Sequence, residues 1–338
     1  MRTYIGTSAD EIIGPDFVSS TVTADPPGTR PSDVAGLLFG DLHTGEGDLT
    51  GGNDTLMGGA GADDLQGDRH EGHGLLMGGN DAVNGGEGDD FLFGDVHAGE
   101  GDLIGGDDTL MGGAGNDELQ GDRHEGVGLL TGGNDVVRGG DGNDSLFGDL
   151  HFGSGNLIGG DDTLIGGRGD DVLVGDDHEG TVTLTGGDDR LIGGAGKDNL
   201  WGAEGRDGLK GGADKDWLAG GEGRDRLTGG TGNDEFVFLS RSDAGDTITD
   251  FGSKSGNDDK FVIDAMGFKG GLEPGRLSSG QFQASNGHDA EDSNIRFIFD
   301  TANETLWFDR NGSKDSGLTL VADLQASATV EAHDILLI

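Results

Sequence analysis

One apolar side chain recurs two residues after an aspartate along most of the chain. The positions are Leu56, Leu65, Val83, Leu92, Leu110, Leu119, Val137, Leu146, Leu164, Leu173, Leu191, Leu200, Leu209, Leu218, Leu227 and Phe236. Successive side chains of a strand point to opposite faces of a sheet, so one apolar residue between polar neighbours predicts a short strand with one buried side chain. We therefore expect these residues to line a core between stacked short strands.

A tetrapeptide of the form Leu-x-Gly-Asp returns at a constant interval, which defines a repeat. It begins at Leu38, Leu65, Leu92, Leu119, Leu146, Leu173 and, in degenerate form, Leu200. Each repeat holds a short, a nonapeptide and a long segment, each ending in one apolar position, and from Gly193 onward the segments are uniform nonapeptides. The long segments add Leu49, Leu76, Leu103, Leu130, Leu157 and Leu184, which we expect in the same core lining. Fixed short periods of this kind predict a solenoid.

Composition changes this picture only in part. The chain has 338 residues, of which 73 are glycine, and 65 acidic residues against 21 basic ones give a formal net charge of −44 at pH 7. High negative charge with few aromatic residues is typical of disorder, but the strict periodicity argues against disorder here. Nucleic acid is not expected as a partner of so acidic a chain, and no apolar run reaches the length of a transmembrane helix.

The glycines indicate tight turns whose oxygens can bind a cation. A turn of about six residues that reverses a very short strand needs positive φ angles, which glycine adopts with the least strain. Such a turn directs backbone carbonyls into a small loop and leaves its aspartate facing the turn of the next coil. Carbonyl and carboxylate oxygens in a flexible ring suit Ca²⁺ and suit transition metals poorly.

The turns "GGAGAD", "GGEGDD", "GGAGND", "GGDGND", "GGRGDD", "GGAGKD", "GGEGRD" and "GGTGND" resemble the calcium-binding nonapeptide of RTX (hemolysin-type) proteins. The resemblance spans roughly residues 37–238. It implies an all-β fold, a right-handed parallel β-roll, with multiple calcium ions held between successive turns by glycine carbonyls and the turn aspartate.

Residue by residue, the resemblance assigns calcium ligands in these turns. The aspartates are Asp63, Asp90, Asp117, Asp144, Asp171, Asp198, Asp207, Asp216, Asp225 and Asp234. The glycines are Gly58, Gly61, Gly85, Gly88, Gly112, Gly115, Gly139, Gly142, Gly166, Gly169, Gly193, Gly196, Gly220, Gly223, Gly229 and Gly232. Two turns depart from the pattern, because Ala203 and Asp214 stand where the family has glycine, which makes their sites doubtful.

A second set of aspartates lies in turns two residues shorter. These are Asp54, Asp81, Asp108, Asp135, Asp162 and Asp189. We expect them either to bind calcium in a different way or not to bind it.

The two ends differ from the repeats and divide the chain into three expected parts. Residues 1–36 hold a degenerate repeat, in which Asp10 and Ile12 keep the spacing, and a proline-rich linker. Residues 37–238 form the roll, and residues 239–338 read as a β-rich cap. After Asp234 we expect alternating strands in "EFVFL", at the end of the roll, and then in "KFVI", "IRFIFD", "ETLWFD" and "HDILLI". The cap resembles the C-terminal domain that follows RTX repeats and carries a type I secretion signal. No cleaved N-terminal signal peptide is recognised.

No catalytic motif stands out. "HEGH" at residues 70–73 falls short of the HExxH zinc motif, and no GxSxG motif occurs. We therefore expect a non-enzymatic, secreted calcium-binding protein of a Gram-negative bacterium that folds on calcium outside the cell, with a structural, adhesive or calcium-buffering role. Its expected partners are calcium ions, the type I secretion machinery and a cell-surface or glycan ligand. The alternatives are a membrane-active, pore-forming RTX effector and a non-catalytic carrier module of a secreted enzyme.

Six histidines occur in "GDxH" segments, one in each repeat, namely His43, His70, His97, His124, His151 and His178. Alternate repeats are more alike than neighbouring ones, which favours two strands per coil and places histidines of one side ~14 Å apart, too far to share an ion. They then act as local turn residues. If each coil instead holds three strands and one whole repeat, consecutive histidines stack ~4.8 Å apart and pairs could bind Zn²⁺ or Ni²⁺.

Overall fold

The computed structural model describes residues 2–5, 12–13, 23–25, 36–46, 48–179, 184–254, 256–313 and 316–338. Two compact units can be distinguished, unit 1 from Met1 to Ile192 and unit 2 from Gly193 to Ile338. Both are built of β-strands that form a parallel β-solenoid, which confirms the expected all-β roll. The expected divisions at residues 36 and 238 stay predictions, and Asp10 and most of the proline-rich linker lie outside the described residues.

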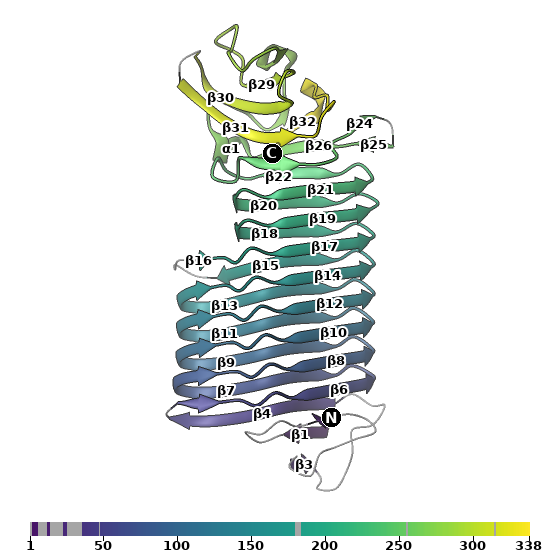
Figure 1. Cartoon of the computed structure of the whole chain (residues 1–338), viewed down its shortest axis with the longest axis vertical. Coiled ribbons are helices and arrows are strands. Elements are labelled where there is room, and N and C mark those ends of the chain that lie inside the picture. The colour runs from purple at the N-terminus through teal and green to yellow at the C-terminus, as the bar shows by residue number, and fades with distance from the viewer. Residues whose placement is uncertain are drawn as a thin grey trace. The chain divides into compact units, whose positions relative to one another are not determined.

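Unit 1 consists of two sheets whose strands stack as successive rungs (Figure 1). The first sheet contains β1 (Arg2–Ile5), β3 (Thr23–Asp25), β4 (Gly36–Glu46), β5 (Leu49–Thr50), β7 (Asp64–Met77), β9 (Phe91–Ile104), β11 (Glu118–Thr131), β13 (Ser145–Ile158), β15 (Val172–Glu179) and β16 (Leu184–Thr185). The second contains β2 (Ile12–Ile13), β6 (Thr55–Ala60), β8 (Ala82–Glu87), β10 (Thr109–Ala114), β12 (Val136–Asp141) and β14 (Thr163–Arg168). β17 (Arg190–Ala195) runs across the boundary between the two units.

Strand register shows that one coil of unit 1 holds one whole repeat. Leu119 pairs with Leu146, and His124 pairs with His151. On the second sheet, Thr109 pairs with Val136. The expectation of two nonapeptide-type strands per coil is therefore wrong for unit 1. The long segment does not pass into the next coil but widens its own, because the strand runs on through the GDxH segment and turns at glycines such as Gly126, with φ 140°.

Two separate columns of apolar side chains fill these wide coils. Leu65, Leu92 and Leu119 on the first sheet are completely buried, as are Leu56 and Leu110 on the second. This confirms that the residues after the turn aspartates form the core. The leucines of the long segments were expected in the same lining, but they pack in a column of their own, formed by Leu76, Leu103, Leu130 and Leu157 with Leu49 and Leu184 beside it.

The N-terminal strand β2 is offset from the expected repeat by one residue. Ile13 pairs with Leu56, and Ile12 pairs with Thr55. The expected correspondence of Ile12 with the core position is therefore wrong by one position.

Unit 2 begins with narrower coils of two nonapeptides each, in which Leu200 pairs with Leu218 and Leu209 pairs with Leu227. One sheet holds β18 (Asn199–Gly205), β20 (Trp217–Gly223), β22 (Glu235–Phe238), β26 (Lys260–Ile263), β32 (Ile335–Leu337) and β27 (Gly275–Arg276). The other holds β19 (Gly208–Ala213), β21 (Arg226–Thr231), β23 (Asp246–Ile248), β31 (Ser316–Leu324), β30 (Thr305–Ser313), β29 (Phe297–Asp300) and β28 (Phe282–Ser285). Here the two-strand coil is correct.

The C-terminal part of unit 2 extends these two sheets around an aromatic core. β32 pairs in parallel with β26, which places Leu337 beside Ile263. The rings of Phe251 and Phe261 stack with centroids 4.6 Å apart. The remaining elements are the pair β24 (Ser253–Lys254) and β25 (Asn257–Asp258), the helix α1 (Ala265–Phe268), and the 3-10 turns η1 (Ser279–Gln281) and η2 (Ala332–Asp334). Within the described ranges, no helix has the length and apolar character needed to cross a membrane.

Candidate calcium sites

The full nonapeptide turns bring carboxylate and carbonyl oxygens together where no side chain could fit. A Cβ on Gly85 would lie 2.2 Å from Asp90 Oδ2 and 2.8 Å from the carbonyl oxygen of Gly112 in the next coil. The third glycine of the turn, Gly88, has φ 133°, a conformation that disfavours other residues. These glycines therefore leave room for a cradle of oxygens between successive turns.

In three successive turns, the aspartate is held by one oxygen and leaves the other oxygen available. The backbone N–H of Asp63 donates to Asp90 Oδ1 at 2.8 Å, and the N–H of Asp90 donates to Asp117 Oδ1 at 2.8 Å. The Oδ2 atoms of Asp63, Asp90 and Asp117 are buried and have no hydrogen-bond partner. Buried oxygens without partners are costly unless a cation binds them, and hard oxygens of this kind are calcium ligands.

Burial raises the pKa of these carboxyl groups. It raises the pKa of Asp90 to about 7 and that of Asp117 to about 6, and in both a backbone hydrogen bond opposes the effect of burial while neighbouring aspartates add to it. The cause is the same at Asp144 and Asp216, where the pKa rises to about 6 and about 7. Burial and neighbouring carboxylates therefore disfavour the ionised form of these groups, and a bound cation would offset that cost, so the electrostatics of the turns fit calcium.

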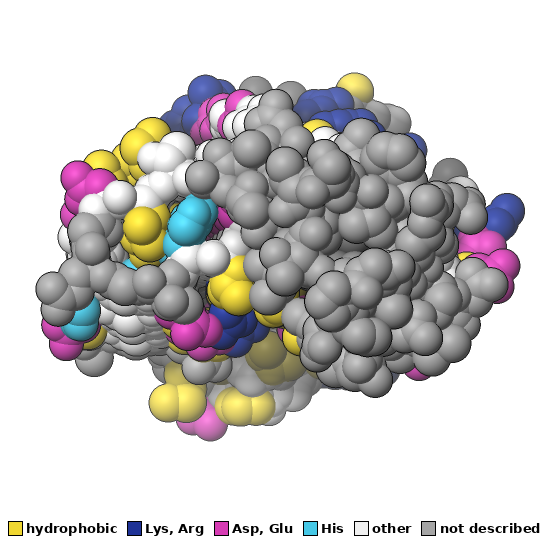
Figure 2. All heavy atoms as spheres, turned by 90° about the horizontal axis from the view of Figure 1, so that it is seen from below, with side chains coloured by type: hydrophobic (Ala, Val, Ile, Leu, Met, Phe, Trp, Pro, Cys, Tyr) yellow, Lys and Arg dark blue, Asp and Glu magenta, His cyan; other side chains and the backbone are white. Residues whose placement is uncertain are grey.

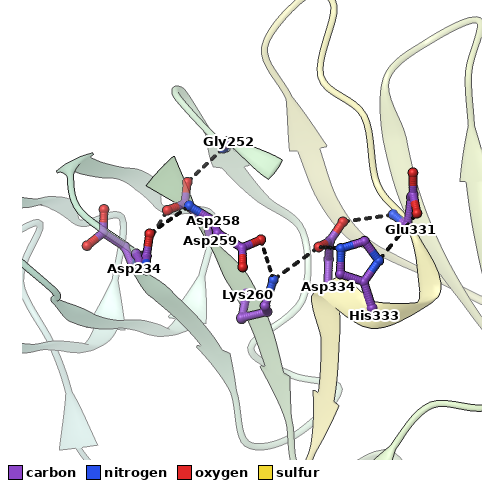
Figure 3. A network of polar contacts seen from close by, with 9 residues as sticks. Asp234, Gly252, Asp258, Asp259, Lys260, Glu331, His333 and Asp334 are labelled. Atoms are coloured by element: carbon purple, nitrogen blue, oxygen red, sulfur yellow. Dashed lines mark hydrogen bonds and ion pairs between the residues drawn. The ribbon is translucent and has the colours of Figure 1, made fainter. Parts of the chain in front are cut away.

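Unit 2 continues this geometry and adds two aspartates that the sequence analysis missed. The N–H of Asp225 donates to Asp246 Oδ1, and the N–H of Asp234 donates to Asp259 Oδ1, both at 3.0 Å. Figure 3 shows Asp259 between Asp234 and Gly252, whose N–H donates to its second oxygen at 2.7 Å. Both residues precede a buried apolar residue by two positions, Ile248 and Phe261, which is the signal that could have identified them.

The two turns that lack a family glycine keep the turn conformation. Ala203 has φ 82° and Asp214 has φ 76°, so both occupy the left-handed region that glycine takes elsewhere. A Cβ on Gly221 would lie 1.9 Å from the carbonyl oxygen of Ala203. Both departures therefore introduce backbone strain, while the neighbouring oxygens stay in place.

The short-turn aspartates also lie inside the coil, across from a row of aspartates that the sequence analysis missed. The second row is the aspartate of each GDxH segment: Asp41, Asp68, Asp95, Asp122, Asp149 and Asp176. Asp95 Oδ2 accepts the N–H of Gly106 in the short turn at 2.8 Å, and Asp81 Oδ1 accepts the N–H of Asp54 at 2.7 Å. The strict recurrence of aspartate in GDxH was the available signal. Burial, together with neighbouring carboxylates, raises the pKa of Asp68 to about 9, and burial raises that of Asp81 to about 8.

The GDxH histidines stack in a buried column. The rings of His97 and His124 have centroids 4.7 Å apart, and those of His124 and His151 are 4.6 Å apart. The expected separation of ~14 Å is therefore wrong, because each coil holds one whole repeat. Seen from the N-terminal end in Figure 2, histidine lies against hydrophobic side chains. Burial and neighbouring histidines lower the pKa of His70 to about 4 and that of His124 to about 3, so these rings are neutral.

The stacked geometry meets the condition for the zinc or nickel hypothesis only in part. Ring planes of His97 and His124 differ by 9°, and those of His124 and His151 by 13°. The lone pair of an imidazole nitrogen lies in the ring plane, so lone pairs of nearly parallel rings do not converge on one ion. The Nδ1 atoms of His124 and His151 are 2.8 Å apart, which is a hydrogen-bonding distance. Binding of a transition metal therefore stays a prediction.

A further acidic cluster in unit 2 is an ion-pair network. Asp258, His333 and Asp334 bring ligand atoms within 4.8 Å of one another, but the ammonium of Lys260 lies between the carboxylates. Lys260 Nζ is 2.7 Å from Asp258 Oδ1 and 3.2 Å from Asp334 Oδ1. Figure 3 shows the two contacts. The network joins β26 to the residues just before the terminal strand β32.

Comparisons with known proteins agree with this geometry. The family model of the RTX calcium-binding nonapeptide repeat, in four copies, matches residues 49–70, 77–102, 104–124, 131–150, 158–179, 181–209 and 210–238, which together make up half of the chain. No curated protein matches the sequence.

Among solved structures, the chain is similar to the solution structure of the AlgE6R3 subunit from the Azotobacter vinelandii mannuronan C5-epimerase. The identity is 26%, the match covers 50% of this chain and 78% of that one, and the TM-score is 0.23. The repeats themselves, matched along half of the sequence and folded into stacked oxygen-lined turns, show that the chain belongs to the RTX calcium-binding nonapeptide repeat family.

Proposed function

We propose that this protein is a secreted, non-enzymatic RTX protein that folds on calcium outside the cell and serves as a structural, adhesive or calcium-buffering element. The observation that carries the proposal is the buried carboxylate oxygen without a partner, such as Asp90 Oδ2, repeated from coil to coil beside a glycine carbonyl. RTX repeat proteins are typically secreted, and calcium outside cells is abundant enough to fill weak sites.

The energetics support folding that depends on calcium. An extracellular-type site with a Kd of ~0.1–1 mM contributes about 1.4 kcal/mol at a tenfold excess of calcium. Ten such sites contribute on the order of 14 kcal/mol, which is comparable with the whole stability of a domain. Without calcium, the same carboxylates repel one another inside the coils.

Circular dichroism in chelator and in millimolar calcium tests the proposal. The chain should be largely disordered in chelator and rich in β-structure with calcium, and magnesium at the same concentration should not replace calcium, because it demands a smaller, octahedral site. A spectrum that is unchanged by chelation would contradict the proposal. Binding of the calcium-loaded protein to a glycan array and to cells would then separate an adhesive role from a purely structural one.

A further inference from the structure

We propose that the GDxH aspartates and the short-turn aspartates form a second file of calcium sites, one between each pair of wide coils, which holds the outer part of each coil closed. The inference rests on the calcium binding proposed above. It concerns residues outside the nonapeptide turns. Oxygens of Asp68, Asp81 and Asp95 lie within 4.8 Å of one another, and the same holds for the groups Asp95, Asp108, Asp122 and Asp122, Asp135, Asp149.

These carboxylates are almost completely buried and each points one oxygen into its group. Asp68, Asp95 and Asp122 have no exposed surface, and Asp108 is 1% exposed. The Oδ1 atoms of Asp68, Asp95 and Asp122, and Oδ2 of Asp108, have no hydrogen-bond partner. The opposite oxygens are fixed by backbone donors, because the N–H of Gly133 donates to Asp122 Oδ2 at 2.8 Å. An acidic group with fixed orientation and unpaired inner oxygens is a built cation site.

Glycine supplies both the space and a further oxygen. A Cβ on Gly94 would lie 1.9 Å from Asp108 Oδ2 and 2.6 Å from the carbonyl oxygen of Gly121. The same arrangement recurs at Gly121, where a Cβ would lie 1.8 Å from Asp135 Oδ2 and 2.7 Å from the carbonyl oxygen of Gly148. Each group of three carboxylates therefore has a backbone carbonyl beside it.

The size of the groups fits calcium. Calcium–oxygen bonds of 2.3–2.6 Å allow ligand oxygens on opposite sides of an ion to lie roughly 5 Å apart, whereas magnesium, at 2.0–2.1 Å, holds them about 4 Å apart. The carboxylate oxygens of each group all lie within 4.8 Å of one another, so one calcium ion can reach all three side chains. Carboxylate and carbonyl oxygens also favour calcium over zinc, which prefers nitrogen and sulfur ligands.

The charges balance with one divalent ion per coil. Each wide coil contributes one GDxH aspartate and one short-turn aspartate, such as Asp95 and Asp108. Asp95 belongs to two successive groups, as does Asp122, so a GDxH carboxylate bridges two sites. Along the file there are therefore two carboxylates for every site. A monovalent ion would leave half of this charge buried and uncompensated.

We call the segment between the GDxH aspartate and the short-turn aspartate of one coil the outer lobe; in the coil of Asp95 and Asp108 it comprises residues 96–107. The proposed calcium sites lie where the two ends of this segment come together, which we call the neck. Asp95 reaches across the neck to Gly106, and Asp108 lies against Gly94 on the opposite limb. Beyond the neck lie the histidine column, with His97, and the leucine column, with Leu103. An ion at the neck joins the two limbs, so its loss should open the lobe and expose both columns.

The test compares two double variants in the same coils. Asp95→Asn with Asp122→Asn removes charge from three second-file groups, and Asp90→Asn with Asp117→Asn is the matched control in the nonapeptide turns. Bound calcium is counted by native mass spectrometry. Diethyl pyrocarbonate labels accessible histidines, and the labelled residues are mapped in excess calcium.

The second-file variant should bind up to three fewer calcium ions than the wild type, one for each of the three groups that contain Asp95 or Asp122. His97 and His124 should become reactive in it, whereas they stay protected in the wild type and in the control variant. A second-file variant that binds as many ions as the wild type, or that loses ions while both histidines stay protected, would overturn the inference.

The wild-type protein gives a measurement that does not depend on how the variants fold. Its calcium count should exceed the number of nonapeptide turns, and a count at or below that number would overturn the second file. A wild-type chain that folds with calcium but shows only the lower count refutes this inference and leaves the proposed function intact. A wild-type chain that neither binds calcium nor folds with it refutes the proposed function itself.

Discussion

Some positions in this fold require glycine because oxygen atoms occupy the space that a Cβ would need. Gly94 has no positive φ angle, so its backbone would accept another residue, yet a Cβ there would enter the space between the Asp108 carboxylate and the Gly121 carbonyl. The repeat therefore requires glycine at this position because there is no room for a methyl group. At Gly88, by contrast, the φ of 133° is itself a reason for glycine.

Replacing Gly94 by alanine should lower the stability of the calcium-loaded protein by about 1–3 kcal/mol, the usual cost of overpacking. The added methyl group displaces the Asp108 carboxylate, so the calcium midpoint should rise as well. Gly280→Ala is the matched control, because a Cβ there meets nothing within 4 Å and its φ is not positive. Chemical denaturation at fixed calcium measures both variants, and equal stability of the two would contradict this account of Gly94.

The histidine column should make folding depend on pH. His70 and His124 have folded-state pKa values lowered to about 4 and about 3, chiefly by burial, and the pKa values of His97 and His151 are lowered by the same cause. A lowered pKa stabilises the folded state above the unfolded pKa, near 6.5, and this stability is lost as the pH falls below that value. At pH 5.5 the loss is about 1.4 kcal/mol for His70 and for His124, whose folded-state pKa values lie well below that pH.

The wild-type protein should therefore need more calcium to fold at pH 5.5 than at pH 7.5. Few aspartates of the unfolded chain take up protons in this range, because their ordinary pKa is far lower, and in the folded chain bound calcium should keep the buried aspartates ionised. A variant with His70, His97, His124 and His151 replaced by glutamine should lose most of the difference. Calcium titrations followed by circular dichroism at both pH values measure the effect, and an equal shift in variant and wild type would assign it to other groups.

At the scale of elements, the sequence predicted the strands and the turns but not how many strands close a coil. The alternation of apolar and polar residues is the same in a coil of two strands and in one of three. The similarity of alternate repeats, which favoured two strands, has another cause. Neighbouring wide coils carry different residues on the face of the sheet opposite the leucine core, whereas alternate coils carry the same ones. Gln120, for example, pairs with Phe93 of one neighbouring coil and with Phe147 of the other. The guanidinium of Arg123 lies over the rings of Phe93 and Phe152, at 5.7 and 4.7 Å.

Because the sequence does not reveal how a coil closes, it identifies only those candidate calcium ligands that belong to a local motif. The nonapeptide aspartates follow from the local motif, and the structure places their carboxylates beside the expected glycines. Asp95 and Asp122 could not be assigned from local sequence, because they act with Asp108 and Asp135 across a coil whose closure was unknown. These aspartates are grouped because one whole repeat fills each coil, and this register is seen only in the pairing of strands between coils.

The outer lobe should contribute to stability through its leucine column. Leu130 is fully buried between Leu103 and Leu157, so Leu130→Ala should cost about 2–5 kcal/mol in lost contacts and cavity. Val127→Ala on the same strand is the control, since Val127 is 52% exposed and should change stability very little. Denaturation in saturating calcium measures both, and a small effect of Leu130→Ala would show that the lobe is already open.

At the scale of the whole molecule, charge sets the condition for folding. The formal net charge of −44 makes the calcium-free chain repel itself, and each bound calcium ion removes two of these charges. Cytosol contains little free calcium, so the chain should stay unfolded there and remain able to pass through a secretion channel. In the proposed secretion, folding outside the cell should then prevent its return.

The proposed secretion signal adds a second reason for export before folding. Ile335 and Leu337 of β32 are buried, and their strand pairs with β26, so a receptor could read these side chains only in the unfolded chain. Deleting residues 280–338 should abolish export by a co-expressed type I system. The truncated chain should still bind calcium through its repeats, and terbium luminescence can measure this binding. Retained binding would exclude damage to the repeats as the cause of lost export. Export of the truncated chain at the wild-type level would place the signal elsewhere in the sequence.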